Sequence, residues 1–154
     1  MKRMKNIFLP ILITSLFIFV ACEDEEAEET AAESGTISGI VTFTGTWPDT
    51  GDVSISLQTS WPPTGPPYAY KVITEDNLNT SNQYDFSFEA VAFRTYKALA
   101  VSWEDLNDPN PATNQHTLGT YGGTVENYFM DPDSIVVSVD HFELIGLDFE
   151  ATFY

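Results

Sequence analysis

The sequence has 154 residues, of which 23 are acidic, six are basic and one is cysteine, and 43% are hydrophobic. This apolar content excludes a largely disordered chain, and a single cysteine excludes an internal disulfide. The net charge of −17 argues against nucleic-acid binding, because phosphate contacts depend on lysine and arginine. One globular domain stabilised by the burial of apolar side chains fits this composition.

Residues 1–21 have the layout of a secretory signal peptide. Basic residues at positions 2, 3 and 5 precede an apolar run from Ile7 to Ala21. A charged start, an apolar centre and small residues at the end are the features of such a leader. A transmembrane helix is the alternative, but it needs about 20 apolar residues, and this run is shorter and contains Pro10. We therefore expect the leader to be removed on export.

Cys22 follows the apolar run directly and is the only cysteine of the chain. The four residues Phe19-Val-Ala-Cys22 resemble the lipobox of bacterial lipoproteins. This resemblance implies that the thiol of Cys22 carries diacylglycerol and that Cys22 is the first mature residue. Each buried methylene of an acyl chain contributes about 0.8 kcal/mol, so several chains would anchor the protein to a membrane. A buried or accidental cysteine is the alternative.

Residues 23–34 hold seven acidic residues and no basic one. Repulsion between like charges predicts a solvated linker over residues 22–35, with a short helix of alanine and glutamate as the alternative. The stretch resembles the surface-export signal of lipoproteins in the Bacteroidetes group of bacteria. It implies an exported protein anchored at the bacterial cell envelope, in the outer membrane and exposed at the cell surface. Without its leader the chain keeps three basic residues against 23 acidic ones, a net charge of −20.

From Thr36 onward, apolar and polar residues alternate with a period of two, which predicts β-strands with one buried face. The run from Tyr96 to Trp103 is apolar on both faces and predicts a central strand. The other alternating runs span residues 36–44, 52–58, 84–89, 134–140 and 145–154. In the last two runs the residues expected to face inward are Ile135, Val137, Val139, Ile145, Leu147, Phe149, Ala151 and Phe153.

Clusters of proline, glycine and asparagine separate these runs and predict turns. They lie at residues 45–51, 61–67, 77–82, 107–111 and 131–133. We therefore predict an all-β domain over residues 36–154, built as an antiparallel β-sandwich of about seven strands. The stretch from Trp61 to Pro67 contains too many prolines for a central strand and is expected in an edge loop.

The run Gly35-Thr-Ile-Ser-Gly-Ile-Val-Thr-Phe-Thr-Gly45 resembles the first strand of transthyretin-like (prealbumin-like), carboxypeptidase regulatory-like domains of secreted bacterial proteins. The segment from Tyr84 to Trp103 is similar to the aromatic strand, turn, Thr-Tyr pair and alanine-rich strand of the same domains. In that family the module is a scaffold or binding accessory without catalytic residues. The resemblance therefore implies a transthyretin-like sandwich with no enzymatic activity of its own.

Motifs for catalysis are missing from the sequence, which has no Gly-x-Ser-x-Gly elbow, no His-Glu-x-x-His and no phosphate loop. His116 and His141 are single histidines in apparent loops. We expect a non-enzymatic protein with a binding or structural role at the cell envelope. Its expected partners are the membrane, through the lipid anchor, and a carbohydrate or an envelope protein. The alternatives are an accessory carbohydrate-binding module and a non-catalytic partner of an envelope enzyme.

Two acidic loops suggest a calcium site. One loop contains the carboxylates of Glu104, Asp105 and Asp108, with Asn107 between them, and the other contains Asp131 and Asp133. Hard oxygen ligands from such loops suit Ca²⁺, which takes six to eight oxygens. In the alternative reading, the aspartates build turns by hydrogen bonding to the backbone.

Aromatic residues in or beside the predicted loops suggest a carbohydrate site. Flat aromatic faces combined with polar side chains are what a sugar-binding site requires. The candidates are Trp47, Trp61, Tyr68 and Tyr70, with Trp103, Tyr121 and Tyr128 nearby in the predicted loops. The alternative is that these rings fill the core. Ser134, in Asp133-Ser-Ile135, resembles a glycosylation acceptor of Bacteroidetes proteins.

Overall fold

The computed structural model describes residues 33–127 and 129–154, which form ten β-strands and two 3₁₀ turns. The predicted leader, Cys22 and the acidic linker up to residue 32 lie outside the described residues. No helix in the described part is long and apolar enough to cross a bilayer. The elements are β1 (Gly35–Thr44), β2 (Val53–Gln58), β3 (Ala69–Ile73), η1 (Glu75–Asn77), β4 (Gln83–Val91), β5 (Arg94–Tyr96), β6 (Ala98–Glu104), β7 (Gln115–Thr120), η2 (Val125–Asn127), β8 (Ile135–Val137), β9 (Glu143–Leu144) and β10 (Phe149–Thr152).

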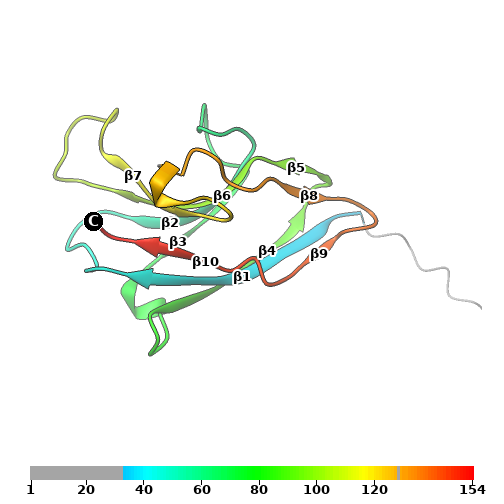
Figure 1. The fold of residues 1–154 in the computed structure, drawn as a ribbon, viewed down its shortest axis with the longest axis horizontal. Coiled ribbons are helices and arrows are strands. Elements are labelled where there is room, and N and C mark those ends of the chain that lie inside the picture. Colours follow the sequence, from blue (N-terminus) through cyan, green and yellow to red (C-terminus); the bar gives the residue numbers. More distant parts are fainter. Residues whose placement is uncertain (1–32, 128) are drawn as a thin grey trace, which may run out of the picture. The chain divides into compact units, whose positions relative to one another are not determined.

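The strands form two four-stranded sheets and one small pair (Figure 1). The first sheet has the order β10-β1-β4, with β9 also paired to β1, and the second sheet has the order β3-β2-β6-β7. Strands β5 and β8 form the separate pair. The predicted all-β, sandwich-like architecture is therefore confirmed. The loop from Trp61 to Pro67 leads into β3, the edge strand of the second sheet, as its prolines predicted.

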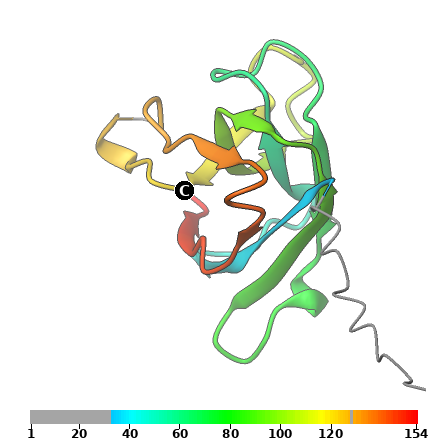
Figure 2. The same cartoon turned by 90° about the vertical axis from the view of Figure 1, so that its right-hand side faces the viewer.

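Strand β1 departs from the predicted antiparallel arrangement. It pairs antiparallel with β4, but it pairs parallel with both β9 and β10. Strand β10 lies beside β1 in both views (Figures 1 and 2). The last part of the chain therefore fills the side of β1 that β4 leaves open, and it gives β1 neighbours that are more than one hundred residues away in sequence.

The core contains the inward residues of both sheets, as the period-two pattern predicted. In β1 and β2, for example, Ile37, Val41, Ile55 and Leu57 are fully buried. Ala98, Leu99, Ala100 and Val101 are all buried, so both faces of this part of β6 are covered, and β6 lies between β2 and β7 within the second sheet. The central-strand prediction is therefore confirmed for β6, whereas Tyr96, where the predicted run began, belongs to β5 of the separate pair.

Two inward positions were predicted wrongly. Val139 is 51% exposed and Ile145 is 78% exposed. The expected strands are interrupted at these points: β8 ends at Val137, and β9 ends before Gly146, which has a left-handed φ of +78°. Each turn breaks the alternation, so the pattern cannot be carried across it.

Candidate functional site

The outward face of the second sheet carries small polar side chains. Ser54 and Ser56 of β2 lie opposite Ser102 and Ala100 of β6. Thr117 of β7 lies opposite Ser102 on the other side of β6. Because alternate residues of a strand share a face, these residues form a continuous floor, which Gln58 extends at the end of β2. We call this surface and its walls the groove.

Two residues of this floor are buried although they are polar. Ser56 is 5% exposed and Gln58 is 8% exposed. The amide Nε2 of Gln58 donates to Ser56 Oγ at 2.9 Å, and Ser56 Oγ donates to the Ala100 carbonyl at 3.4 Å. A glutamine amide has two donor hydrogens and one acceptor oxygen. The bond to Ser56 therefore fixes the amide while leaving one donor and the acceptor for other partners.

Aromatic rings and prolines wall the groove. Trp61, Pro62, Pro63 and Pro67 come from the loop before β3, and Tyr70 comes from β3 itself. The groove has a volume of about 690 Å³, which is within the range of small-molecule sites. Trp61 is held in place because its indole Nε1 donates to the Phe129 carbonyl at 2.8 Å. Tyr70 is 64% exposed, so its ring face is open to a ligand.

The lining of the groove contains no aspartate, glutamate, lysine or arginine. This neutrality is unexpected in a chain of net charge −17. A charged ligand would have to lose its hydration without gaining a partner here, which is costly. An uncharged ligand with many hydroxyl groups would instead find amide, hydroxyl and aromatic partners. The groove can therefore bind such a ligand by hydrogen bonds and stacking.

His116 lies at the rim of the groove, and its ring stacks on Trp103 with centroids 5.1 Å apart. Within the described residues, no hydrogen bond joins this ring to Ser54, Ser56 or Ser102. A serine nucleophile needs a base within hydrogen-bond reach. The groove serines and His116 therefore do not form such a pair in this structure.

Of the four aromatic residues predicted to bind sugar, the structure places two in the groove and two elsewhere. Trp61 and Tyr70 both line the groove. Trp47 instead packs edge-on against Phe43 and Phe153, with ring centroids 5.3 and 5.0 Å away. The four residues therefore do not form one site.

Tyr68 has a packing role beside the core. Its ring packs on Tyr96 at 5.0 Å, and its hydroxyl accepts the Ala92 backbone N–H at 3.0 Å. Tyr96 is fully buried and donates its own hydroxyl to the Ala92 carbonyl at 2.9 Å. Burial raises the pKa of Tyr96 well above its usual range, and the adjacent Tyr68 hydroxyl adds to the rise. These contacts occupy the polar end of Tyr68.

Three further aromatic residues were predicted near the loops. Trp103 stacks on His116, and its indole Nε1 donates to the Thr50 carbonyl at 2.8 Å. Tyr121 is partly buried against the core. Tyr128 lies outside the described residues.

The carboxylates of the first acidic loop are used locally. Asp105 accepts the Asn107 backbone N–H at 2.9 Å. Asp108 accepts the Thr113 hydroxyl at 2.6 Å and the Asn110 backbone N–H at 2.9 Å. These two hydrogen bonds, that of Thr113 first, lower the pKa of Asp108. The aspartates of this loop therefore build turns, as the alternative reading proposed.

The second acidic loop lies at the other end of the β6–β7 pair. The backbone N–H of Asp133 donates to the Tyr121 carbonyl, and the N–H of Tyr121 donates to the Leu99 carbonyl. Glu104 follows Leu99 in β6 by five residue steps, a span of roughly 17 Å. Asp131 accepts a long hydrogen bond of 3.5 Å from Asn127.

The predicted calcium ligands Glu104, Asp105, Asp108, Asp131 and Asp133 are therefore not brought together. Across residues 33–127 and 129–154, no three carboxylate, histidine or cysteine side chains are grouped so that they could hold a metal ion. A two-loop calcium site would need both loops at the same end of β6. The strand pairing places them at opposite ends.

The floor residues Ser54, Ser56, Gln58, Ser102 and Thr117 were not singled out from the sequence. In an alternating strand, polar positions indicate only a solvent-facing side. The available signal was the position of Gln58 just before the Trp61–Pro67 loop, which returns over the same strand. In comparisons with known proteins, no family model, no curated protein and no solved structure matches this chain.

Proposed function

We propose that this chain is a lipid-anchored, exported and non-enzymatic binding protein of the bacterial cell envelope, and that the groove is its ligand-binding site. The observation that carries the proposal is the uncharged lining of the groove within a strongly acidic protein. The net charge of −17 of the whole chain repels polyanions. The groove itself therefore favours ligands without charge.

Neutral carbohydrate is the ligand class that best suits the groove, so the protein acts as an accessory carbohydrate-binding module. The open face of Tyr70 and the indole of Trp61 offer apolar surfaces on which a sugar ring packs. Gln58 and the serines of the floor offer donors and acceptors for sugar hydroxyls. A few well-placed polar groups between apolar walls are the usual means by which a pocket fixes the orientation of a ligand.

A binding experiment tests the ligand class directly. The full chain, purified in detergent, is applied to an array of neutral glycans, and affinities for the captured glycans are measured by titration calorimetry. Tyr70→Ala is expected to weaken binding about tenfold, because truncation of an aromatic contact typically costs more than 1 kcal/mol. Ile145→Ala is the control, since Ile145 is an exposed apolar residue outside the groove. Capture of no neutral glycan would contradict the proposed ligand.

The lipid anchor is supported by the apolar leader that ends at Cys22, the only cysteine of the chain. Mass spectrometry of the native protein is expected to find acyl chains on Cys22 and no residues before it. A Cys22→Ser variant is expected to leave the membrane fraction. A native protein that begins at Met1 without modification would contradict the anchor.

The absence of catalysis is supported by the resemblance to non-enzymatic accessory domains and by the lack of a serine–histidine pair in the described groove. Prolonged incubation with each captured glycan is expected to give no product of lower mass. Turnover that is lost in a Ser56→Ala variant would contradict this part of the proposal.

A further inference from the structure

Two further hollows continue the groove across the edge of the second sheet. The second hollow has a volume of about 410 Å³ and shares Gln115, His116 and Thr117 of β7 with the groove. The third hollow has a volume of about 420 Å³ and shares Val125, Phe129 and Tyr154 with the second. Because neighbouring hollows share their walls, the three lie in series. Each has the volume of a site for a small molecule.

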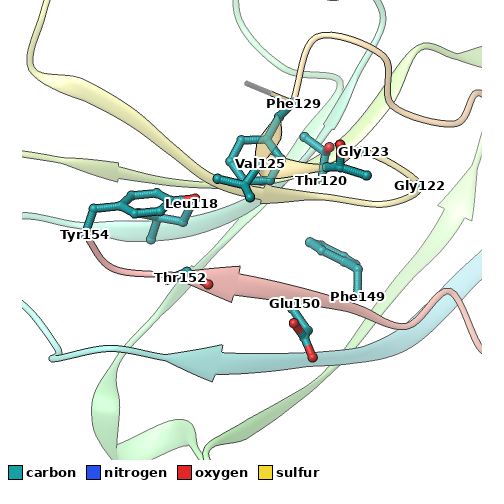
Figure 3. Close-up of a pocket in the computed structure, with 11 residues that line it drawn as sticks. Leu118, Thr120, Gly122, Gly123, Val125, Phe129, Phe149, Glu150, Thr152 and Tyr154 are labelled. Carbon is teal, nitrogen blue, oxygen red and sulfur yellow. The ribbon is translucent and has the colours of Figure 1, made fainter. Parts of the chain in front are cut away.

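The third hollow lies where the edges of the two sheets meet (Figure 3). Phe149 points from β10 toward Val125 and Phe129, and Leu118 of β7 closes the apolar side. Glu150 is the only carboxylate in the lining, and Figure 3 shows its side chain on the opposite side of β10 from Phe149. The third hollow therefore has one charged residue in its lining, and the side chain of that residue does not point the same way as Phe149.

Each hollow combines an aromatic surface with hydroxyl or amide groups. The groove has Trp61 and Tyr70, and the other two hollows share Phe129 and Tyr154. Thr120, in the third hollow, is 2% exposed, and its hydroxyl has no hydrogen-bond partner in the described part of the chain. A buried hydroxyl without a partner costs about 1–3 kcal/mol. A hydroxylated ligand that reaches Thr120 would recover part of this cost.

Phe129 connects the two ends of the series. Its carbonyl accepts the indole N–H of Trp61 at the wall of the groove, and its side chain, 9% exposed, walls the second and third hollows. A rearrangement of Phe129 at one end would therefore disturb Trp61 at the other. Through Phe129, the groove and the two hollows are therefore structurally linked.

We propose that the groove and the two hollows form one continuous path that binds the interior of a linear, uncharged polysaccharide, with successive sugar units in successive hollows. This inference rests on the proposed function, and it adds that the ligand is an extended chain and not a terminal sugar. Glu150 is the only aspartate, glutamate, lysine or arginine in the three linings, which matches a neutral polymer, and the repetition of aromatic and hydroxyl groups matches a repeating ligand.

An extended peptide is the competing occupant, because β7 is an edge strand that could pair with another strand. The edge is obstructed, however. A side-chain atom at Gly119 of β7 would collide with the Glu150 carbonyl of β10, so β10 already covers β7 at this point. A peptide could pair only with the residues before Gly119, whereas a sugar chain does not depend on a free strand edge.

The test compares short and long chains of the same sugar. Disaccharides and hexasaccharides of the gluco-, manno- and xylo-series are titrated against the full chain in detergent. We expect at least one series in which the hexasaccharide binds at least tenfold more tightly than its disaccharide. Tyr154→Ala, at the far end of the path, is expected to remove most of that gain. Tyr70→Ala is expected to weaken binding of both lengths, and Ile145→Ala neither.

The outcomes separate the two proposals. The continuous path would be overturned if the disaccharide and the hexasaccharide bound with equal affinity. It would also be overturned if the Tyr154→Ala variant kept the full preference for the hexasaccharide. Either result would leave the groove as a sugar site. Failure of every glycan to bind would overturn both. An uncharged peptide rich in serine and glutamine is the third probe. If it binds more tightly than any hexasaccharide, the path belongs to a protein partner and the proposal is wrong.

Discussion

The outward faces of the two sheets differ in charge. The first sheet exposes Asp85 and Glu89 on β4 and Glu150 on β10. The second sheet exposes serine, threonine, tyrosine and glutamine at the corresponding positions, with Glu104 only at the end of β6. Both faces belong to alternating strands of similar length. Whether a strand carries charged residues on its outward side therefore depends on the sheet to which it belongs, and not on its length or its alternating pattern.

This difference shows how an average composition can hide a site. A protein with 23 acidic residues must place almost all of them on its surface, because an unpaired buried carboxylate is costly. A groove without an acidic or basic residue in its lining then stands out against the rest of the surface. The polar residues there are also partly buried by the Trp61–Pro67 loop, which is unusual for an outward face.

Introducing an aspartate on the outward face of each sheet is expected to give the largest difference in stability between the two faces. Ser56→Asp is expected to lower the free energy of unfolding by about 3 kcal/mol, because Ser56 is 5% exposed and no cation lines the groove. Ser87→Asp, on the outward face of β4, is expected to change it by about 0.5 kcal/mol. Urea unfolding of both variants measures the contrast. Equal losses would mean that the neutrality of the groove has no energetic basis.

A substitution at Gly119, where β7 meets β10, is expected to have the next largest effect on stability. A methyl group at Gly119 would meet the Glu150 carbonyl and the Ala151 backbone of β10. Backbone atoms cannot move aside as a flexible side chain can, so Gly119→Ala is expected to cost about 1–3 kcal/mol. Thermal and urea unfolding give the value. Gly65→Ala is the matched control, because a methyl group there would meet no neighbouring atom, and equal stability of both variants would contradict a tight junction.

The buried hydroxyl of Tyr96 supports the end of the second sheet from which β3 begins. Tyr96→Phe is expected to cost about 1 kcal/mol at neutral pH, because the hydrogen bond to the Ala92 carbonyl is lost.

The same substitution has a pH signature. The pKa of Tyr96 is raised in the folded state, so the contribution of its neutral form is complete below the unfolded value near 10. It is lost as pH rises above that value, by up to about 1.4 kcal/mol per pH unit. The variant lacks this dependence, so the gap between the two proteins should narrow above pH 10. A constant gap in urea unfolding at alkaline pH would contradict the burial of an un-ionised hydroxyl.

Divalent ions should have the smallest effect, and an unselective one. Calcium and magnesium chloride at matched ionic strength are expected to raise the melting temperature by the same small amount, because both screen repulsion between exposed carboxylates. Asp131→Asn should leave the response to calcium unchanged, since Asp131 and Glu104 lie at opposite ends of β6. A rise with calcium alone that Asp131→Asn removes would restore the two-loop site.

The fold class was predictable because the strongest alternations, such as that from Val53 to Leu57, continue through whole strands. Four strands were missed for physical reasons. Strands β5 and β9 have only three and two residues, too few to show an alternation. Strand β7 has only one large apolar residue, Leu118, and β3 is an edge strand whose Tyr70 and Val72 face outward and are exposed. The parallel pairing of β1 with β10 was not predictable either, because a period of two is the same in both strand directions.

The candidate site was predictable only from its walls. Trp61 and Tyr70 stood out as aromatic residues near prolines, but the same criterion also selected Trp47 and Tyr68, which pack against other rings. Gln58 and Ser56 gave no signal, because their burial depends on a loop that returns over their own strand. The pairing of β2 with β6 had to be known before the neutral floor could be assembled.

The position of β1 has a mechanical consequence. A pull on Gly35 along the strand acts across the hydrogen bonds to β4 on one side and to β9 and β10 on the other. Bonds loaded sideways in this way share the force and must give way together, whereas bonds at a hairpin end open one at a time. Forced unfolding is governed by the rate of crossing that barrier. If a membrane anchor holds the chain before Gly35 while a polymer occupies the groove, β1 is the strand that bears the tension between them.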